Sequence, residues 1–357
     1  MNTTRFLWAW ILLAAGLAVF GAPREPAGTE EKTVRVAGSI DGFVEYLPGD
    51  LPLIISVPHG GQLQSSGIPD RARGEFTSDA NTEELARALR QVFGERLGRQ
   101  PHIIICRIER KKVDCNRPIE EGAGGNPLGQ KVWRQFQDHI ETARAAVSAR
   151  YGQGLYIDLH GQSHPIKRVE LGYCLSHEDL TNSNAVLDKD PGFAEASSIS
   201  SLAKRSSIPF SDLLRGANSL GAMLAARGYP AVPSPDMPDP GDGNSFFDGG
   251  YNVRRHGSAA AGSIDGVQVE VNFAGIRDTA LNRKNFLNPA SAPSSLEAGK
   301  RCPPSNHPEP SPLPDLFDQE AFHRIGYFIF RIIAKNHQMK FFLQVPNARY
   351  DLPCHAM

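Results

Sequence analysis

The sequence predicts an α/β fold in which helices flank a mixed, largely parallel central sheet. Four short apolar segments have the length and composition of buried strands, and amphipathic helical patterns lie between them. The predicted strands are residues 51–57, 101–108, 155–159 and 267–273, and the clearest helical patterns are residues 81–97 and 132–149. Strands that alternate with amphipathic helices are typical of a mainly parallel sheet with helices on both faces.

The composition indicates one large globular domain rather than a charged or disordered chain. Hydrophobic residues make up 40% and aromatic residues 8% of the 357 residues, and the formal net charge is −1. Such a balanced charge gives no bulk attraction to nucleic acid or to an anionic membrane surface, so we expect a small-molecule or peptide ligand. The predicted division is a main domain at 41–340 between a linker at 23–40 and a C-terminal tail at 341–357. Irregular insertions are expected near 181–206, 231–250 and 288–315, and a last amphipathic helix near 318–336.

The N-terminal segment, residues 1–22, reads as a signal peptide. Arg5 precedes the apolar run at 6–20, which ends in Gly21-Ala22-Pro23. A positive start, a short apolar core and small residues at its end are typical of a secretory signal. The run is shorter than the roughly 20 residues that a membrane-spanning helix needs, which favours cleavage over an uncleaved anchor. We therefore expect a secreted or lumenal protein, which contacts a membrane only if this segment is retained.

Five cysteines are compatible with disulfides in such a protein but leave one thiol over. They are Cys106, Cys115, Cys174, Cys302 and Cys354. None belongs to a Cys-x-x-Cys pair, so the sequence gives little support to a cysteine zinc site. Cys302 and Cys354 lie in the same C-terminal region and could pair, although the sequence leaves the connectivity open.

Two predicted strands run into a His-Gly pair, at His59 and at His160. Ligands of open α/β sheets bind beyond the carboxyl ends of the strands, so both imidazoles are expected at the same rim. Imidazole is a common zinc ligand, and a catalytic zinc ion usually has three protein ligands and a water molecule. A single histidine at a strand end would more often serve as a hydrogen-bonding group, but the matched pair favours a metal site.

Such a metal site needs a third ligand, and carboxylates are frequent after His59. The candidates are Asp79, Glu75, Glu83 and Glu84. Asp79 directly precedes the predicted helix at 81–97 and could instead cap its N-terminus. The residue types alone do not choose among the four.

The strand at 267–273 alternates strictly, so Gln268, Glu270 and Asn272 share one face. This pattern fits an edge strand with a wet face, or a strand that presents Glu270 to the metal as a general base. Glu170 is the alternative base. Asp158 shares a strand face with His160 and could orient that imidazole.

A basic stretch follows the strand at 101–108 and ends in Asn116-Arg117-Pro118. Such runs usually form solvated turns. A guanidinium can also bind a carboxylate through two parallel hydrogen bonds, which makes Arg117 a candidate for substrate binding. Arg254 and Arg255 are further candidates.

An ordered series of short motifs resembles the N-formylglutamate amidohydrolase family. The motifs are SVPHGG (56–61), TSDANTEEL (77–85), VDCNRP (113–118), IDLHGQ (157–162), GGYNVRRHG (249–257) and VQVEVN (267–272). The resemblance covers about residues 50–280, and an ordered series is more specific than any single motif. It implies a fold related to the zinc carboxypeptidases (phosphorylase/hydrolase-like) and an amidohydrolase-like main domain.

The resemblance also implies a role for each matching residue. His59, Asp79 and His160 match ligands of one zinc ion, and Glu270 matches the general base. Asn116, Arg117 and Arg254 match positions expected to hold a substrate carboxylate.

Two features depart from related enzymes. Gln62 stands where a zinc carboxypeptidase would have the glutamate of His-x-x-Glu, which argues against a conventional carboxypeptidase. His164 adds a second imidazole close to the site.

The expected activity is therefore zinc-dependent hydrolysis of an amide bond next to a free carboxylate, in an N-formyl or N-acyl amino acid or a small peptide. A peptidase or N-acyl-amino-acid deacylase on the same scaffold is the alternative within the enzymes. A secreted, non-catalytic binding protein that keeps the fold is the alternative outside them. A metal-free glycan hydrolase would need only paired carboxylates and would leave the two histidines unexplained.

Overall fold

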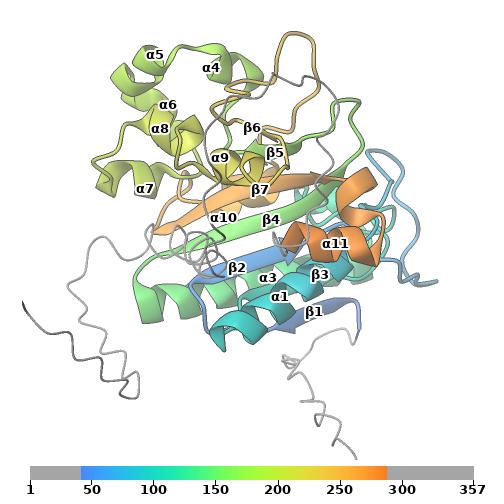
Figure 1. Cartoon of the computed structure of the whole chain (residues 1–357). Helices are drawn as coiled ribbons and strands as arrows, with labels where there is room; N and C mark the ends of the chain where they lie inside the picture. Colours follow the sequence, from blue (N-terminus) through green and yellow to red (C-terminus); the bar gives the residue numbers. More distant parts are fainter. Residues whose placement is uncertain (1–41, 288–357) are drawn as a thin grey trace, which may run out of the picture. The chain divides into compact units, whose positions relative to one another are not determined.

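A seven-stranded mixed sheet forms the centre of the computed structural model, which describes residues 42–287 (Figure 1). The strands are β1 (Val44–Leu47), β2 (Leu53–Val57), β3 (His102–Cys106), β4 (Gly154–Gln162), β5 (Val169–Gly172), β6 (Ala231–Val232) and β7 (Ile264–Asn272). Their order in the sheet is β1-β3-β2-β4-β7-β5-β6. The four central strands β3, β2, β4 and β7 are parallel, whereas β1 and β5 pair with their neighbours β3 and β7 in antiparallel fashion. The predicted fold class is confirmed.

Helices cover both faces of the sheet, as predicted. One face packs against α1 (Thr82–Leu97) and, near β7, against α7 (Ser200–Arg205); α11 (Ala280–Leu287) packs on α1. The opposite face packs against α3 (Pro127–Tyr151) and α10 (Tyr251–His256). The predicted helices at 81–97 and 132–149 correspond to α1 and α3.

No described helix is long and apolar enough to cross a membrane. The predicted signal segment at 1–22, the linker at 23–40, the insertion at 288–315 and the helix at 318–336 lie outside the described residues.

The segment at 181–206, expected to be irregular, contains short helices instead. The remaining short helices are α2 (Ile119–Gly122), α4 (His177–Thr181), α5 (Asn184–Lys189), α6 (Pro191–Ala196), α8 (Phe210–Arg215) and α9 (Leu220–Ala225). Small polar residues begin several of them, because their side chains accept a hydrogen bond from the first turn. Ser176 caps α4 and Asp190 caps α6 in this way. The segment therefore consists of short helices rather than one long loop.

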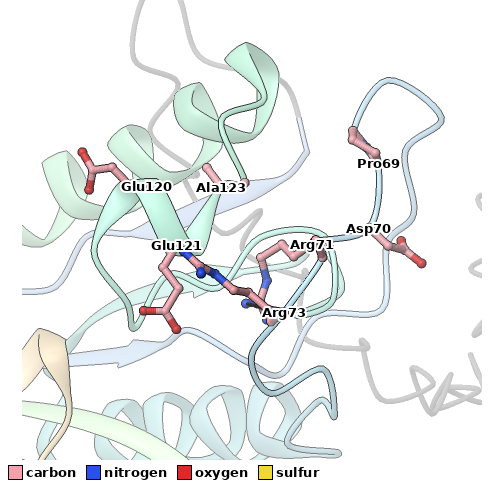
Figure 2. Close-up of a pocket in the computed structure, with 9 residues that line it drawn as sticks. Pro69, Asp70, Arg71, Arg73, Glu120, Glu121 and Ala123 are labelled. Carbon is pink, nitrogen blue, oxygen red and sulfur yellow. Dashed lines mark hydrogen bonds between the residues drawn. The ribbon is translucent and has the colours of Figure 1, made fainter.

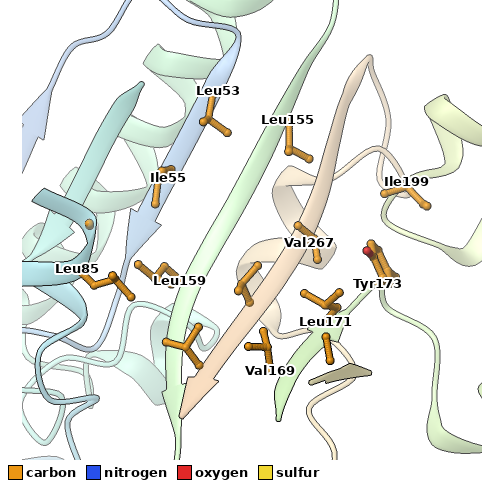
Figure 3. Packing of buried hydrophobic residues seen from close by; sticks show 14 of the residues in the cluster. Leu53, Ile55, Leu85, Leu155, Leu159, Val169, Leu171, Tyr173, Ile199 and Val267 are labelled. Atoms are coloured by element: carbon orange, nitrogen blue, oxygen red, sulfur yellow. The ribbon is translucent and has the colours of Figure 1, made fainter. Parts of the chain in front are cut away.

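The alternating strand β7 separates an apolar core from the polar face that carries the site. Val267, Val269 and Val271 belong to the larger apolar cluster, which Figure 3 shows on β2, β4, β5 and β7. The intervening side chains Gln268 and Glu270 lie on the other face. All nine residues of β7 are buried between β4 and β5. The alternative of an edge strand with a wet face is wrong, because loops and helices cover both faces here.

Strand register then brings three of the candidate side chains into one row. His160 on β4 is the register partner of Glu270 on β7, and Glu270 is the partner of Glu170 on β5. Directly paired residues on neighbouring strands project to the same face with Cβ atoms about 5 Å apart. The sheet thus places the His160 imidazole at one end of a row whose next two members are the carboxyl groups of Glu270 and Glu170.

Arg277 fixes the end of this row from the turn η1 (Phe273–Arg277) that follows β7. Its buried guanidinium donates to the carbonyl groups of Val271, Ala80 and Gln162. A Cβ atom on Gly161 would overlap this guanidinium. A larger residue directly after His160 would displace the Arg277 guanidinium from its carbonyl partners.

Replacing Gly161 with alanine should lower the free energy of unfolding of the metal-free protein by about 2 kcal/mol or more, because Arg277 must leave its carbonyl partners. Chemical denaturation measures the change. Gly67→Ala is the matched control, since its new Cβ would meet only the ends of the Leu128 and Ser65 side chains, at 3.1 and 3.7 Å. Equal stability of the two variants would contradict the packing argument.

Candidate metal centre

His59, Asp79 and His160 meet in one buried cluster. One potential ligand atom from each lies within 4.8 Å of the other two, and the group could hold a metal ion. His160 Nδ1 lies 3.1 Å and His59 Nδ1 3.5 Å from the same oxygen, Asp79 Oδ2. The two ring centroids are 4.8 Å apart. The structure therefore brings together the three residues predicted as ligands, although they are far apart in the sequence.

The loop after β2 aims Asp79 at the two histidines. The Asp79 N–H donates to the carbonyl oxygen of His59 at 2.9 Å, and the Gly161 N–H donates to Asp79 Oδ2 at 3.1 Å. The alternative role as a helix cap is not observed, because Asn81 occupies the N-cap position of α1. The carboxylate is left to face the imidazoles.

The other three candidate carboxylates are used elsewhere. Glu75 accepts hydrogen bonds from the backbone of its own loop, Glu83 pairs with Arg87 at 2.9 Å, and Glu84 is exposed. Only Asp79 of the four stands in the cluster.

One buried nitrogen of the cluster lacks a hydrogen-bond partner, and a bound cation could satisfy it. His59 Nδ1 is buried without such a partner among the described residues. An unsatisfied buried nitrogen costs roughly 1–3 kcal/mol unless another group satisfies it. The same nitrogen faces Asp79 and the Nδ1 side of His160, so a cation bound by these three groups would satisfy it. The donor set therefore fits a metal ion.

Each imidazole is held from behind by a buried aspartate. His59 Nε2 lies 2.7 Å from Asp114 Oδ1, and His160 Nε2 lies 2.9 Å from Asp158 Oδ2. The position of Asp158 thus supports its expected role, which is to orient the His160 imidazole. The matching role of Asp114 was missed, although it stands in the VDCNRP motif two residues before Asn116. A hydrogen bond at one ring nitrogen fixes the tautomer and leaves the other nitrogen free to bind a metal.

These contacts shift the pKa values of the cluster in the metal-free protein. Burial alone would lower the pKa of His160, but the Asp158 and Glu270 carboxylates outweigh it and hold this pKa well above the usual value. Burial would raise the pKa of Asp79, yet the two imidazoles hold it well below the usual value. The site therefore stabilises positive charge between fixed carboxylates.

Glu270 is buried next to this cluster, 3.9 Å from His160 Nδ1. Burial raises its pKa to about 8, against the opposing effect of His160, and the Asp79 and Glu170 charges add to the rise. Gln268 donates to Glu270 Oε1 at 2.8 Å and orients the carboxyl group. A carboxyl group that titrates near neutral pH can both take and release a proton.

Glu170, the rival base, is engaged by other groups. Its Oε1 lies 3.0 Å from His164 Nδ1, and its Oε2 accepts the N–H of Phe247 at 3.0 Å. His164 stacks on Phe247 with ring centroids 4.8 Å apart. These contacts anchor the loop before α10 to β5. They favour Glu270 over Glu170 as the group facing the cluster.

Asn116 lies in the site, whereas the two predicted arginines point to acidic side chains. Asn116 Nδ2 is 3.3 Å from His160 Nε2, and its Oδ1 accepts the N–H of Asn252 at 2.8 Å. The Arg117 side chain is 40% exposed and pairs with Glu121 at 3.5 Å. The Arg254 side chain is 54% exposed and pairs with Asp248 at 3.1 Å. Their role in holding a substrate carboxylate stays a prediction.

Arg255, the further candidate, contacts aromatic rings rather than a carboxylate. It stacks over the aromatic rings of Trp133 and Tyr251.

Two other arginines lie closer to the cluster. Arg110, whose side chain is only 12% exposed, has Nη1 at 3.8 Å from Asp79 Oδ1 and donates from Nε to Asp114 Oδ2 at 3.1 Å. Arg71 Nη2 lies 3.7 Å from the same Asp114 oxygen. The basic run after β3 was expected to be a solvated turn, and for Arg110 this expectation is wrong because its side chain turns inward to buried carboxylates.

A polar pocket of about 300 Å³ is lined in part by Arg71, one of these two arginines. Figure 2 shows Arg71, Arg73 and Glu121 around it, from the loop after β2 and from α2. Its lining residues are Pro69, Asp70, Arg71, Ala72, Arg73, Glu120, Glu121, Ala123 and Gly124. Since Glu121 also pairs with Arg117, this pocket lies beside the motif expected to bind a carboxylate.

The pKa of Glu270 gives a pH-dependent prediction for the metal-free protein. Because its folded pKa of about 8 exceeds the unfolded value of 4.5, its contribution to stability is present below pH 4.5 and is lost as the pH rises to 8. Metal-free Glu270→Gln should therefore gain stability over wild type by up to about 1.4 kcal/mol per pH unit in this range. Urea denaturation at several pH values measures it, with the exposed Glu120→Gln as control. A difference that does not grow with pH would contradict this assignment.

Comparisons with known proteins give a similarity of fold. No family model matches the chain, and no curated protein matches its sequence. Among solved structures, the chain is similar to an N-formylglutamate amidohydrolase from Ralstonia eutropha JMP134, with 13% identity, 69% of this chain and 93% of that chain covered, and a TM-score of 0.41. It is also similar to a gene product of Agrobacterium tumefaciens, with 13% identity, 66% and 84% covered, and a TM-score of 0.33. The first of these carries the name of the family that the ordered motifs resemble.

Proposed function

We propose that this chain is a zinc-dependent hydrolase that cleaves an amide bond next to a free carboxylate. The observation that carries the proposal is the buried cluster of His59, Asp79 and His160, with an unsatisfied imidazole nitrogen, beside the carboxyl group of Glu270.

The donor set supports zinc in a catalytic rather than a structural site. Two imidazoles and one carboxylate are a known ligand combination of catalytic zinc, which keeps a further position for water or substrate. Bound there, zinc would polarise the substrate carbonyl and lower the pKa of a water molecule to about 7. Asp114 and Asp158 hold the far nitrogens of the two imidazoles, so both rings present Nδ1 to the same point.

Glu270 supplies the proton transfer in this proposal. It stands on the same strand row as His160, and its environment raises its pKa to about 8. A positively charged ligand nearby would favour its carboxylate form, in which it accepts a proton from the attacking water. The same carboxyl group then donates this proton to the leaving nitrogen.

In this proposal the arginines bind the substrate, and the buried Asn116 supports the site. Asn116 accepts the backbone N–H of Asn252 through Oδ1, and its Nδ2 packs 3.3 Å from His160 Nε2, which Asp158 already holds. This supports a role in packing against the imidazole rather than in direct substrate binding. Arg117 and Arg254 are the proposed carboxylate binders. Their exposed pairs with Glu121 and Asp248 are weak in water, so a substrate carboxylate could replace either partner.

Two alternatives use the same cluster. A peptidase or N-acyl-amino-acid deacylase would share the zinc site and differ in the size of the group it accepts. A secreted binding protein would keep the fold without turnover, but the buried position of Glu270 beside the ligands favours an enzyme. Secretion itself is a proposal that rests on the apolar run at 6–20.

The test is a hydrolysis screen of formyl-, acetyl- and peptidyl-amino acids on zinc-loaded protein, with free and amidated carboxyl termini. We expect one zinc ion per chain and turnover only with the free carboxylate. Glu270→Gln should lower kcat about 10²- to 10⁴-fold while the zinc content measured by plasma mass spectrometry stays the same. Glu95→Gln, which changes an exposed carboxylate on α1, is the matched control.

Three results would count against the proposal. Without near-stoichiometric zinc and without turnover after zinc reconstitution, the enzyme assignment fails. Full activity of Glu270→Gln would remove Glu270 as the base, and Glu170 would be tested next. Equal turnover of free and amidated substrates would remove the proposed role of Arg117 and Arg254.

A further inference from the structure

Two buried cysteines lie in contact next to the metal cluster. Cys115 Sγ is 3.6 Å from Cys106 Sγ, and both side chains are fully buried in the apolar cluster beneath α3. Cys106 ends strand β3, and Cys115 lies in the segment that follows it. The Cys115 thiol donates a hydrogen bond to Cys106 Sγ, and no disulfide joins the two sulfur atoms.

The position of Cys115 links this pair to the site. Its neighbours are Asp114, which holds His59, and Asn116, which contacts His160. A constraint on Cys115 is therefore a constraint on groups that orient both imidazoles.

We propose that Cys106 and Cys115 form a disulfide that braces the segment 114–116 against strand β3. The approach needed is small, because a disulfide has an S–S distance of about 2.05 Å and the sulfur atoms are already in contact. The apolar surroundings offer neither thiol a metal or a catalytic partner. This proposal does not depend on the proposed hydrolase activity.

The oxidant is a small-molecule disulfide, as found in oxidising compartments. One cysteine thiolate attacks a sulfur of the oxidant and releases one small thiol, and a mixed disulfide forms. The second cysteine thiolate then attacks the protein sulfur of this mixed disulfide and releases the second small thiol. The protein loses two hydrogens, and the oxidant is reduced to two thiols.

Burial determines when this reaction takes place. Burial raises the pKa of the Cys115 thiol well above its usual value, and neighbouring groups add to the rise, so Cys115 of the folded, reduced protein holds little thiolate. We therefore expect rapid oxidation during folding and slow oxidation of the folded protein.

The pair also accounts for two of the five cysteines. Cys302 and Cys354, the pair suggested by the sequence, lie outside the described residues. Cys174, the third described cysteine, is buried elsewhere.

The test is peptide mapping of the full chain refolded with oxidised glutathione. Any free thiols are alkylated in denaturant, and the chain is then digested without reductant. Trypsin cuts after Arg107 and Lys112, so Cys106 and Cys115 fall on separate peptides. We expect these two peptides to be linked by one disulfide, with a loss of two hydrogens. Recovery of both peptides in alkylated form would overturn the proposal.

A second measurement tests the bracing. Amide hydrogen exchange across residues 113–118 should be about tenfold slower in oxidised than in reduced protein, and the midpoint of thermal unfolding should rise by about 5 °C or more. Cys174→Ser is the matched control and should keep both differences, whereas Cys115→Ser should abolish them. If Cys115→Ser does not fold, the comparison of oxidised and reduced wild type suffices. Equal exchange in the two wild-type forms would refute the bracing role.

Discussion

The interaction on which the site depends is the attraction between buried carboxylates and a positive charge at its centre. Asp79, Asp114, Asp158 and Glu270 are all buried around the imidazoles of His59 and His160. Removing so many carboxylates from water is expensive unless cations or hydrogen bonds compensate. In the metal-free protein, protons offset part of this buried negative charge, since the pKa values of His160 and Glu270 are both raised. A divalent cation between the two Nδ1 atoms would take over that role.

Strand register makes this concentration of charge possible. The parallel strands β4 and β7 carry His160 and Glu270 at the same level, and the antiparallel strand β5 adds Glu170 beside them. A shift of one residue in β7 would send Glu270 into the apolar cluster and Val269 into the site. Gly161 and Arg277 fix the end of the row, and the segment 114–116 holds the imidazoles from the other side. The sheet and the loops thus constrain the same few side chains.

The sequence predicts the centre of the fold better than its borders. Long apolar runs and the strict alternation at 267–273 identify the four central strands, because burial of both faces leaves a clear hydrophobic pattern. The strands β1, β5 and β6 are short and were not predicted, and six-residue helices at 181–206 carry too little periodicity to be seen. The histidines were recognisable from their place after strands. Asp79 needed the family resemblance, because four carboxylates follow His59 at plausible spacings.

The contacts that Asp114 and Arg110 make in the site were not predicted from the sequence. Asp114 and Arg110 lie in a basic stretch that reads as a surface turn, and only the folded chain shows that Arg110 turns inward to Asp114. The arginines that the motifs favour, Arg117 and Arg254, are the exposed ones.

The most direct test of the central claim is a crystal structure of zinc-loaded protein with anomalous diffraction data collected on both sides of the zinc absorption edge. We expect one strong anomalous peak about 2.0–2.2 Å from His59 Nδ1, His160 Nδ1 and an Asp79 carboxylate oxygen. A zinc peak at another site, with these three side chains still hydrogen-bonded to one another, would contradict it.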